Sequence, residues 1–220
     1  MDSAVQEKRK DIKEVIIMEN RMVKFYSKES NMLALHAIPG HFATNHSHVN
    51  YYVDMTKIKT HHAVAKETAR ELAKAYVSIL SVDTIICLEG TEIIGAFLAR
   101  ELAKEGHTSI NAGKDICVIT PETNANNQMI FRDNIQKDIF GKQILLLISS
   151  ASTGKTINRS VECLQYYNGH LAGVASIFSA IKDYNGIEIN SVFTSDDLDG
   201  YETMPASECS LCKSGQRVDA

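Results

Sequence analysis

The sequence predicts an α/β protein in which helices flank a central parallel sheet. Short apolar runs alternate with helical patterns, as is typical of parallel strands joined by helical crossovers. Residues 144–148 are apolar at every position, which indicates a central strand buried on both faces. The chain has 220 residues, of which 44% are hydrophobic and 23% are charged. This length and composition suit a single domain over 1–220.

The first part of the chain contains two predicted helices separated by a hairpin segment. Residues 5–25 place apolar side chains at roughly helical spacing, which predicts an amphipathic helix. Residues 33–55 have little helical periodicity and end in a strand-like Tyr-Tyr-Val run, so we expect a loop and a hairpin there. Residues 62–80 are rich in helix formers and lead directly into a buried strand at 84–88.

Further strand and helix patterns follow in alternation. A helix is predicted at 93–102 and a strand at 116–120. Residues 121–141 are polar and rich in asparagine, and long loops of this kind inside compact domains are usually functional, so this segment is a candidate lid. The remaining predicted elements are the strand 144–148, a helix at 157–167, a strand with its following turn at 171–181 and a short last strand at 191–194.

The most informative segment joins the strand 144–148 to the next helix through small hydroxyl-bearing residues. Glycine allows the main chain to approach an anion, the first amides of a helix lack partners within the helix, and hydroxyls add donors. Ligands of open α/β sheets also bind at the carboxyl ends of strands. The sequence therefore predicts a phosphate site formed by Ser152, Thr153, Gly154, Lys155 and Thr156.

Two families have a loop of this type. A P-loop nucleotide-binding protein requires G-x-x-x-x-G-K-[ST], but Ser149 stands at the first glycine position, which disfavours a P-loop kinase. Type I phosphoribosyltransferases have apolar residues, then two acidic residues, then T-T-G-x-T. Residues 152–156 resemble the end of this motif, whereas Ser149 and Ser150 occupy the positions of the acidic pair.

Other segments resemble the orotate branch of the same family. Residues 41–54 resemble its N-terminal segment, best at the Y-x-D ending, which makes Tyr52 a candidate for stacking on a base. Residues 209–215 are similar to a C-P-L-C-x-x-G tail found in some members. A third segment resembles the family's short pyrophosphate-binding turn, and its candidate site residues are Glu89, Gly90, Thr91 and Glu92.

The resemblance implies the type I phosphoribosyltransferase (Rossmann-like) fold, with a small hood from about 30–60 and the tail 200–220 as a candidate addition. It further implies transfer of a 5-phosphoribosyl group from 5-phosphoribosyl-1-diphosphate (PRPP) to a nitrogenous base, orotate or a related one, in nucleotide metabolism and pyrimidine biosynthesis. The other implied properties are Mg²⁺ on the diphosphate, a nucleoside monophosphate as product, and a homodimer.

Two departures from the family pattern predict weak activity. Serines can bind ribose hydroxyls without supplying charge, and a charge-assisted hydrogen bond exceeds a neutral one by on the order of 1 kcal/mol. Loss of both acidic residues then predicts roughly a ten- to hundredfold deficit in rate. The mobile-loop segment also offers only Arg132 and Lys137 to neutralise the leaving pyrophosphate. The alternative is a non-catalytic sensor of ribose phosphates or nucleotides with the same fold.

Each motif also has a purely structural interpretation. The hydroxyl-rich turn could cap a helix, Thr91 could do the same after the preceding strand, and Tyr52 could pack within the hood. Cys209 and Cys212 form one C-x-x-C pair, which is half of a tetrahedral zinc site. We therefore favour a structural role for this pair, with a metal shared with a histidine as the alternative.

Composition disfavours several other classes of protein. The net charge of −4 and a pI near 6.1 give no broad basic surface, so nucleic acid is not an expected partner. A membrane-spanning helix needs about 20 apolar residues, and the apolar runs here are far shorter. The first ten residues are polar and charged, unlike a secretory signal, so we expect a cytoplasmic protein. The five cysteines do not indicate disulfides.

Overall fold

The computed structural model describes residues 21–44, 47–105, 109–124 and 128–219. Most of the helix predicted at 5–25 lies outside these ranges, and its last part is not helical. Val23–Tyr26 forms strand β1 instead and pairs antiparallel with the following strand, Val23 opposite Ala37 and Tyr26 opposite Ala34. Main-chain pairing at the sheet edge therefore overrides the helical spacing of the apolar residues.

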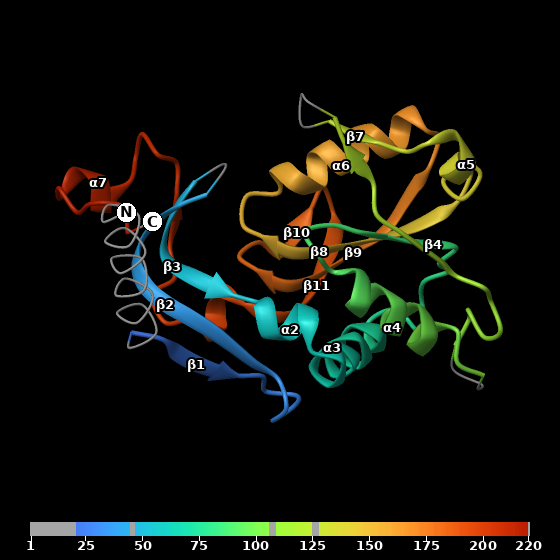
Figure 1. The fold of residues 1–220 in the computed structure, drawn as a ribbon, viewed down its shortest axis with the longest axis horizontal. Helices are drawn as coiled ribbons and strands as arrows, with labels where there is room; N and C mark the ends of the chain where they lie inside the picture. Colours follow the sequence, from blue (N-terminus) through green and yellow to red (C-terminus); the bar gives the residue numbers. More distant parts are fainter. Residues whose placement is uncertain (1–20, 45–46, 106–108, 125–127, 220) are drawn as a thin grey trace, which may run out of the picture.

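A six-stranded sheet forms the centre of the molecule (Figure 1). The pairs β4–β5, β4–β8, β8–β9 and β9–β11 are all parallel, and only the edge strand β10 runs antiparallel to its neighbour. This arrangement confirms the predicted α/β fold with a parallel sheet. The strands in spatial order are β10 (Asp183–Tyr184), β11 (Ile187–Thr194), β9 (His170–Ser179), β8 (Gln143–Ala151), β4 (Thr84–Cys87) and β5 (Cys117–Ile119).

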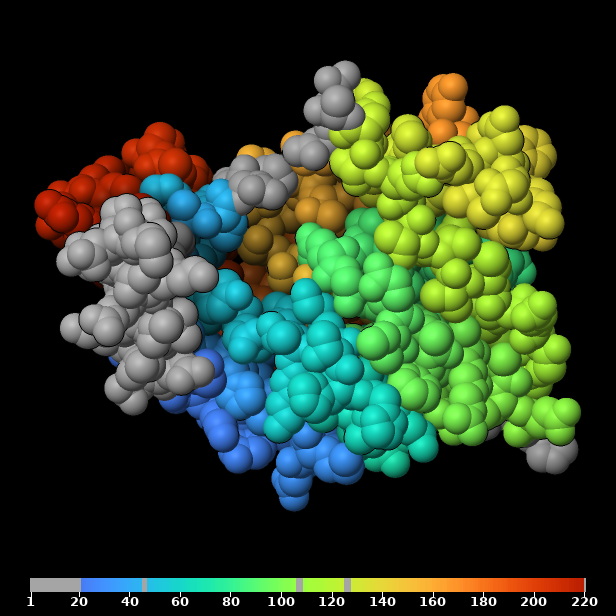
Figure 2. Space-filling model, in the orientation of Figure 1, coloured from blue at the N-terminus to red at the C-terminus, as the bar shows by residue number. Residues whose placement is uncertain are grey.

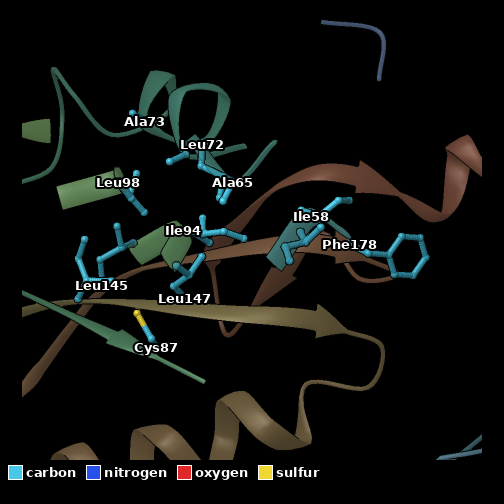
Figure 3. Close-up of a cluster of buried hydrophobic side chains, with 14 of the residues drawn as sticks. Ile58, Ala65, Leu72, Ala73, Cys87, Ile94, Leu98, Leu145, Leu147 and Phe178 are labelled. Carbon is cyan, nitrogen blue, oxygen red and sulfur yellow. The ribbon is translucent and has the colours of Figure 1, made fainter. Parts of the chain in front are cut away.

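Helices cover both faces of this sheet. On one face α3 (His62–Lys74) and α4 (Glu92–Leu102) pack against alternate residues of β8, represented by Leu145 and Leu147 (Figure 3). On the other face α6 (Lys155–Tyr166) packs over Ile144, Leu146 and Ile148 of the same strand. The strand is therefore buried on both sides, as its continuous apolar run predicts.

A second, antiparallel sheet forms a hood beside the carboxyl ends of the central strands (Figure 1). Its strand from the tail pairs Thr203 with Val49 and Met204 with His48, so the C-terminal segment contributes to the hood. The helix α2 (Thr56–Thr60) leads from the hood back to α3. The hood strands in spatial order are β1, β2 (Ala34–Ala43), β3 (His48–Asp54) and β12 (Thr203–Met204), and the short helix α7 (Ser210–Lys213) follows.

Two predicted segments differ in detail from the structure. The helix predicted at 62–80 ends at Lys74 and continues as turns, where the Tyr76 hydroxyl donates to the Val174 carbonyl at 2.6 Å. The candidate lid at 121–141 contains short regular elements in its described residues, and Phe131 and Ile139 fix it to the core. The elements of this segment are β6 (Glu122–Thr123), β7 (Met129–Ile130) and α5 (Asp133–Gln136). Elsewhere, a 3₁₀ turn, Ser195–Asp197, follows β11.

Candidate functional site

A cavity of about 150 Å³ opens at the carboxyl end of β8, between the central sheet and the hood. In Figure 2 the gold atoms of the segment that follows β8 lie recessed between the blue hood and the green atoms that follow β4. All five predicted phosphate-site residues line this cavity. The full set of lining residues is Thr44, Glu89, Ile148, Ser150, Ala151, Ser152, Thr153, Gly154, Lys155, Thr156 and Ile157.

The turn into α6 has the geometry of an anion-binding loop. Gly154 is the N-cap residue with φ 73°, a left-handed conformation that favours glycine. No side chain caps this helix, which argues against the purely structural interpretation of its hydroxyls. The first main-chain bond within the helix runs from the Asn158 amide to the Gly154 carbonyl. The amides of the first turn therefore point toward the cavity without acceptors in the helix.

The Glu89 carboxylate reaches across from the end of β4 to the two serines. Its Oε2 accepts the Ser149 hydroxyl at 2.5 Å, the Ser149 amide at 3.2 Å and the Ser150 amide at 3.4 Å. Glu89 has φ 58° and Gly90 has φ 80°, so the turn is strained at the residue that makes these contacts. Lys59 of α2 donates to the Glu89 carbonyl at 3.0 Å and holds the turn from outside.

The side chains after Gly90 support this turn. Thr91 is fully buried, and its hydroxyl is 2.9 Å from the Leu88 carbonyl and 3.2 Å from the Leu147 carbonyl. Thr91 is the N-cap residue of α4, as the structural alternative expects, but its side chain makes no capping hydrogen bond. The Glu92 carboxylate instead accepts the Thr120 hydroxyl at 3.1 Å. Of these turn residues, only Glu89 lines the cavity.

The structure does not bring the two mobile-loop cations to the cavity. Arg132 forms a two-point ion pair with Glu122 across the β6–β7 hairpin, with Nη2 to Oε2 at 2.8 Å. Lys137 ends α5, and the next residue, Asp138, accepts the hydroxyl of Thr84 through its carbonyl at 2.6 Å. Because Thr84 begins β4, Lys137 lies at the opposite end of the sheet from the phosphate loop.

Tyr52 lies on β3 in the hood and is 48% exposed. Its ring contacts Phe42 with a centroid distance of 5.7 Å, and it does not line the cavity. Its neighbour Tyr51 stacks on Tyr201 and donates to the Asp199 carbonyl at 3.2 Å. Tyr52 thus has room on its open side for a flat group, whereas Tyr51 is used within the hood.

Two site features could not be found from local sequence. Glu89 precedes its serine partners by about 60 residues, as the sequence separations of 60 and 61 show. Cys209 and Cys212 meet His41 and His48 of the hood, and only the C-x-x-C half has a sequence signature. In both cases strand order brings the groups together, and a polar residue just after a predicted strand is the one available signal.

No family model and no curated protein matches the chain. Solved structures do match. Leishmania donovani UMP synthase superposes with a TM-score of 0.55 at 18% identity over 74% of this chain, which spans only 34% of that longer chain. Mycobacterium tuberculosis orotate phosphoribosyltransferase matches with a TM-score of 0.51 at 16% identity, covering 74% of this chain and 91% of that one.

A third match is the adenine phosphoribosyltransferase of Thermoanaerobacter pseudethanolicus, with a TM-score of 0.50 at 14% identity, over 82% of this chain and 99% of that chain. The chain has the type I phosphoribosyltransferase fold. The identities are too low to transfer a substrate, but the shared fold confirms the fold expected from the phosphate-loop motif. In the part of the chain that the structure describes, no helix is long and apolar enough to cross a bilayer.

Proposed function

We propose that this protein binds a ribose 5-phosphate compound, PRPP or a nucleoside monophosphate, and acts as a phosphoribosyltransferase of nucleotide metabolism. The observation that carries the proposal is the open turn at Gly154, where uncapped helix amides, the hydroxyls of Ser152 and Thr153 and the Lys155 side chain line one cavity. This donor set suits a phosphate dianion. The fold shared with orotate and adenine phosphoribosyltransferases supports the same assignment.

The chain's own residues would divide the substrate between two subsites. The loop 152–156 would hold the 5′-phosphate, which places the ribose toward the two serines and Glu89. A carboxylate here would face the positive charge that develops on the sugar ring during transfer. Glu89 is therefore our candidate for the electrostatic role that the family assigns to its acidic pair, and Ser149 would hold it in position.

The cavity also has an oxygen ligand for Mg²⁺, which takes one or two carboxylates together with substrate phosphate oxygens and water. Among the described residues that line the cavity, Glu89 is the one carboxylate, so it and the diphosphate would hold the ion. When bound, Mg²⁺ would offset the charge of the leaving diphosphate. Lys155 lines the cavity and would provide a protein cation, whereas Arg132 is paired with Glu122.

The acceptor and the assembly belong to the same proposal. Orotate or a related flat base would be the acceptor, with the exposed ring of Tyr52 as its stacking partner. A homodimer is expected from the family resemblance, and a cytoplasmic location from the polar first ten residues.

Calorimetric titration with PRPP and a nucleoside monophosphate tests the binding step, and pyrophosphate release across a panel of bases tests transfer. The key variant is Glu89→Gln, with Glu92→Gln as the matched control one turn away. In the absence of Mg²⁺, removing a negative charge beside a polyanion should leave PRPP affinity unchanged or raise it. With Mg²⁺ present, loss of cation stabilisation should lower the transfer rate about tenfold or more. Glu92→Gln should behave as wild type. Failure of the wild-type protein to bind either compound would refute the proposal.

A second candidate is a non-catalytic sensor of the same ligands. The neutral serines and the paired state of Arg132 favour it, because both features weaken turnover without closing the cavity. Tight binding of PRPP, with no pyrophosphate released from it in the presence of any base of the panel, would decide for the sensor.

A further inference from the structure

Four metal-binding side chains converge on the hood, away from the phosphate cavity. Their ligand atoms all lie within 4.8 Å of one another. They come from three separate parts of the chain, since one histidine lies on β2, the other begins β3 and the cysteines flank the start of α7. Figure 1 shows α7, in red, beside the blue strands of the hood. The four residues are His41, His48, Cys209 and Cys212.

The separations match those of a tetrahedral zinc site. Bond lengths of about 2.3 Å to sulfur and 2.05 Å to nitrogen imply N···N of about 3.3 Å and N···S of about 3.6 Å. His41 Nε2 lies 3.0 Å from His48 Nδ1, 3.4 Å from Cys209 Sγ and 3.6 Å from Cys212 Sγ. Cys212 Sγ lies 3.3 Å from His48 Nδ1. The two remaining separations, from Cys209 Sγ to His48 and to Cys212, are at most 4.8 Å, so one ion can reach all four atoms after small side-chain adjustments.

Neighbouring main-chain groups orient the ligands. His41 Nδ1 lies 2.9 Å from the Gln216 carbonyl, so this nitrogen carries the proton and Nε2 presents its lone pair to the cluster. The Cys212 amide donates to Cys209 Sγ at 3.5 Å, so the main chain holds this sulfur beside His41. Hydrogen bonds that orient a side chain in this way are typical of metal ligands.

We propose that His41, His48, Cys209 and Cys212 bind one structural Zn²⁺. On binding, the two thiols release their protons to solvent and form two S–Zn bonds, while the neutral imidazoles form two N–Zn bonds. The two thiolate charges cancel the charge of the ion, so the complete site is neutral. This neutrality matters because His41 and Cys209 are each 0% exposed, and an isolated thiolate there would be costly. The exposed Cys212 provides the route of entry.

The proposed site would fasten the C-terminal tail to the hood. Asp219 already accepts the His41 amide at 2.7 Å and returns its own amide to the His41 carbonyl at 2.7 Å. Strand β12 pairs with His48. Both histidines belong to the β2–β3 hairpin, which also carries Thr44 on the cavity wall. Zinc would thus link the β2–β3 hairpin to the C-terminal tail. This role is independent of the proposed transferase activity.

The test uses the full-length protein purified under reducing conditions. Elemental analysis should find one zinc per chain, and Co²⁺ exchange should give thiolate charge-transfer absorption and the visible bands of a tetrahedral site. Chelation should lower the melting temperature and increase hydrogen exchange in the β2–β3 hairpin. Cys212→Ser and His48→Ala each remove a ligand. Each should weaken zinc binding by more than the roughly 10–100-fold that follows loss of a hydrogen-bond partner of a metal ligand. Cys209→Ser should do the same.

Matched controls are Cys117→Ser and His170→Asn, which remove a partly exposed thiol and an exposed imidazole outside the cluster. Both should retain one zinc and the cobalt spectrum. Cys212 is exposed, so its serine variant reports even where the buried Cys209→Ser variant fails to fold. Wild-type protein that binds no more zinc than Cys212→Ser, or cobalt spectra without thiolate charge transfer, would overturn the proposal in favour of a hydrogen-bonded cluster.

Discussion

Replacing Gly154 by alanine tests both the stability of the turn before α6 and its role in phosphate binding. The residue has φ 73°, and a left-handed conformation costs an L-residue about 1–2 kcal/mol. A Cβ at this position would lie 3.4 Å from Ile181 Cδ1 and 3.5 Å from Tyr184 Cδ2, both ordinary contacts, so steric overlap adds nothing. We therefore expect Gly154→Ala to lower the free energy of unfolding by about 1–2 kcal/mol, measured by urea titration.

The same strain should move the first amides of α6. Loss of one charge-assisted hydrogen bond to a phosphate costs about 1.5–3 kcal/mol, which corresponds to roughly a ten- to hundredfold weaker affinity. The assay is calorimetric titration with ribose 5-phosphate. The control is Gly141→Ala, because Gly141 has φ 68°, leaves open space for 4 Å around the position of an added Cβ and precedes β8 at the far end of the sheet. Equal affinity of the two variants would refute the phosphate-loop assignment.

Three further predictions concern packing, ionisation and the hairpin cation. A Cβ on Gly95 would overlap the Cys87 sulfur at 2.3 Å. Overpacking costs about 1–3 kcal/mol, so Gly95→Ala should be less stable in urea and Cys87→Ala should rescue it. Burial raises the pKa of the Cys87 thiol from 9.0 to about 12. Because the unfolded thiol loses its proton at lower pH than the buried one, the free energy of unfolding should be constant below about pH 9 and fall as the pH rises further. The fall should be less steep in Cys87→Ala. Glu122→Gln should release Arg132 and strengthen PRPP binding without changing the melting temperature.

Each of these has a contrary outcome that is easily read. A Gly95→Ala protein that remains equally destabilised with Cys87→Ala would show that the sulfur is not the obstacle. Identical alkaline unfolding of wild type and Cys87→Ala would assign the loss of stability to other groups. Unchanged PRPP affinity in Glu122→Gln would mean that Arg132 does not reach the cavity once it is free of its partner.

The parts of the fold that follow from the sequence are those whose side chains have one environment along a whole element. The run 144–148 is apolar on every side because β8 is buried on both faces, and its prediction is confirmed. The helix prediction was wrong at the end of 5–25, where the edge strand β1 forms. This strand is stabilised by main-chain pairing with β2, which requires no particular side-chain pattern. Likewise, the described part of the polar segment 121–141 is held to the core by two buried residues, Phe131 and Ile139, too sparse a signal to predict its hairpin.

The candidate site shows the same division between local and long-range information. The loop 152–156 is contiguous, so its residue types suffice to predict an anion site. The Glu89 contact requires β4 and β8 to be neighbours, and the His41 contact with Cys209 joins residues 168 apart in the sequence. Such pairs become visible only when sheet order is known, because no periodicity connects them.

The Glu89 contact changes how the absent acidic pair should be interpreted. In the family motif that residues 149–156 resemble, two carboxylates stand where β8 carries Ser149 and Ser150. In the folded protein one carboxylate does lie beside these serines, because the strained turn after β4 places Glu89 Oε2 2.5 Å from the Ser149 hydroxyl. Strain in a turn persists only where the surrounding structure holds it, and here Lys59 and Thr91 do so from either side. Under the proposed transfer reaction, Glu89 would supply the negative charge of the site, so the rate deficit of Glu89→Gln would measure its electrostatic contribution.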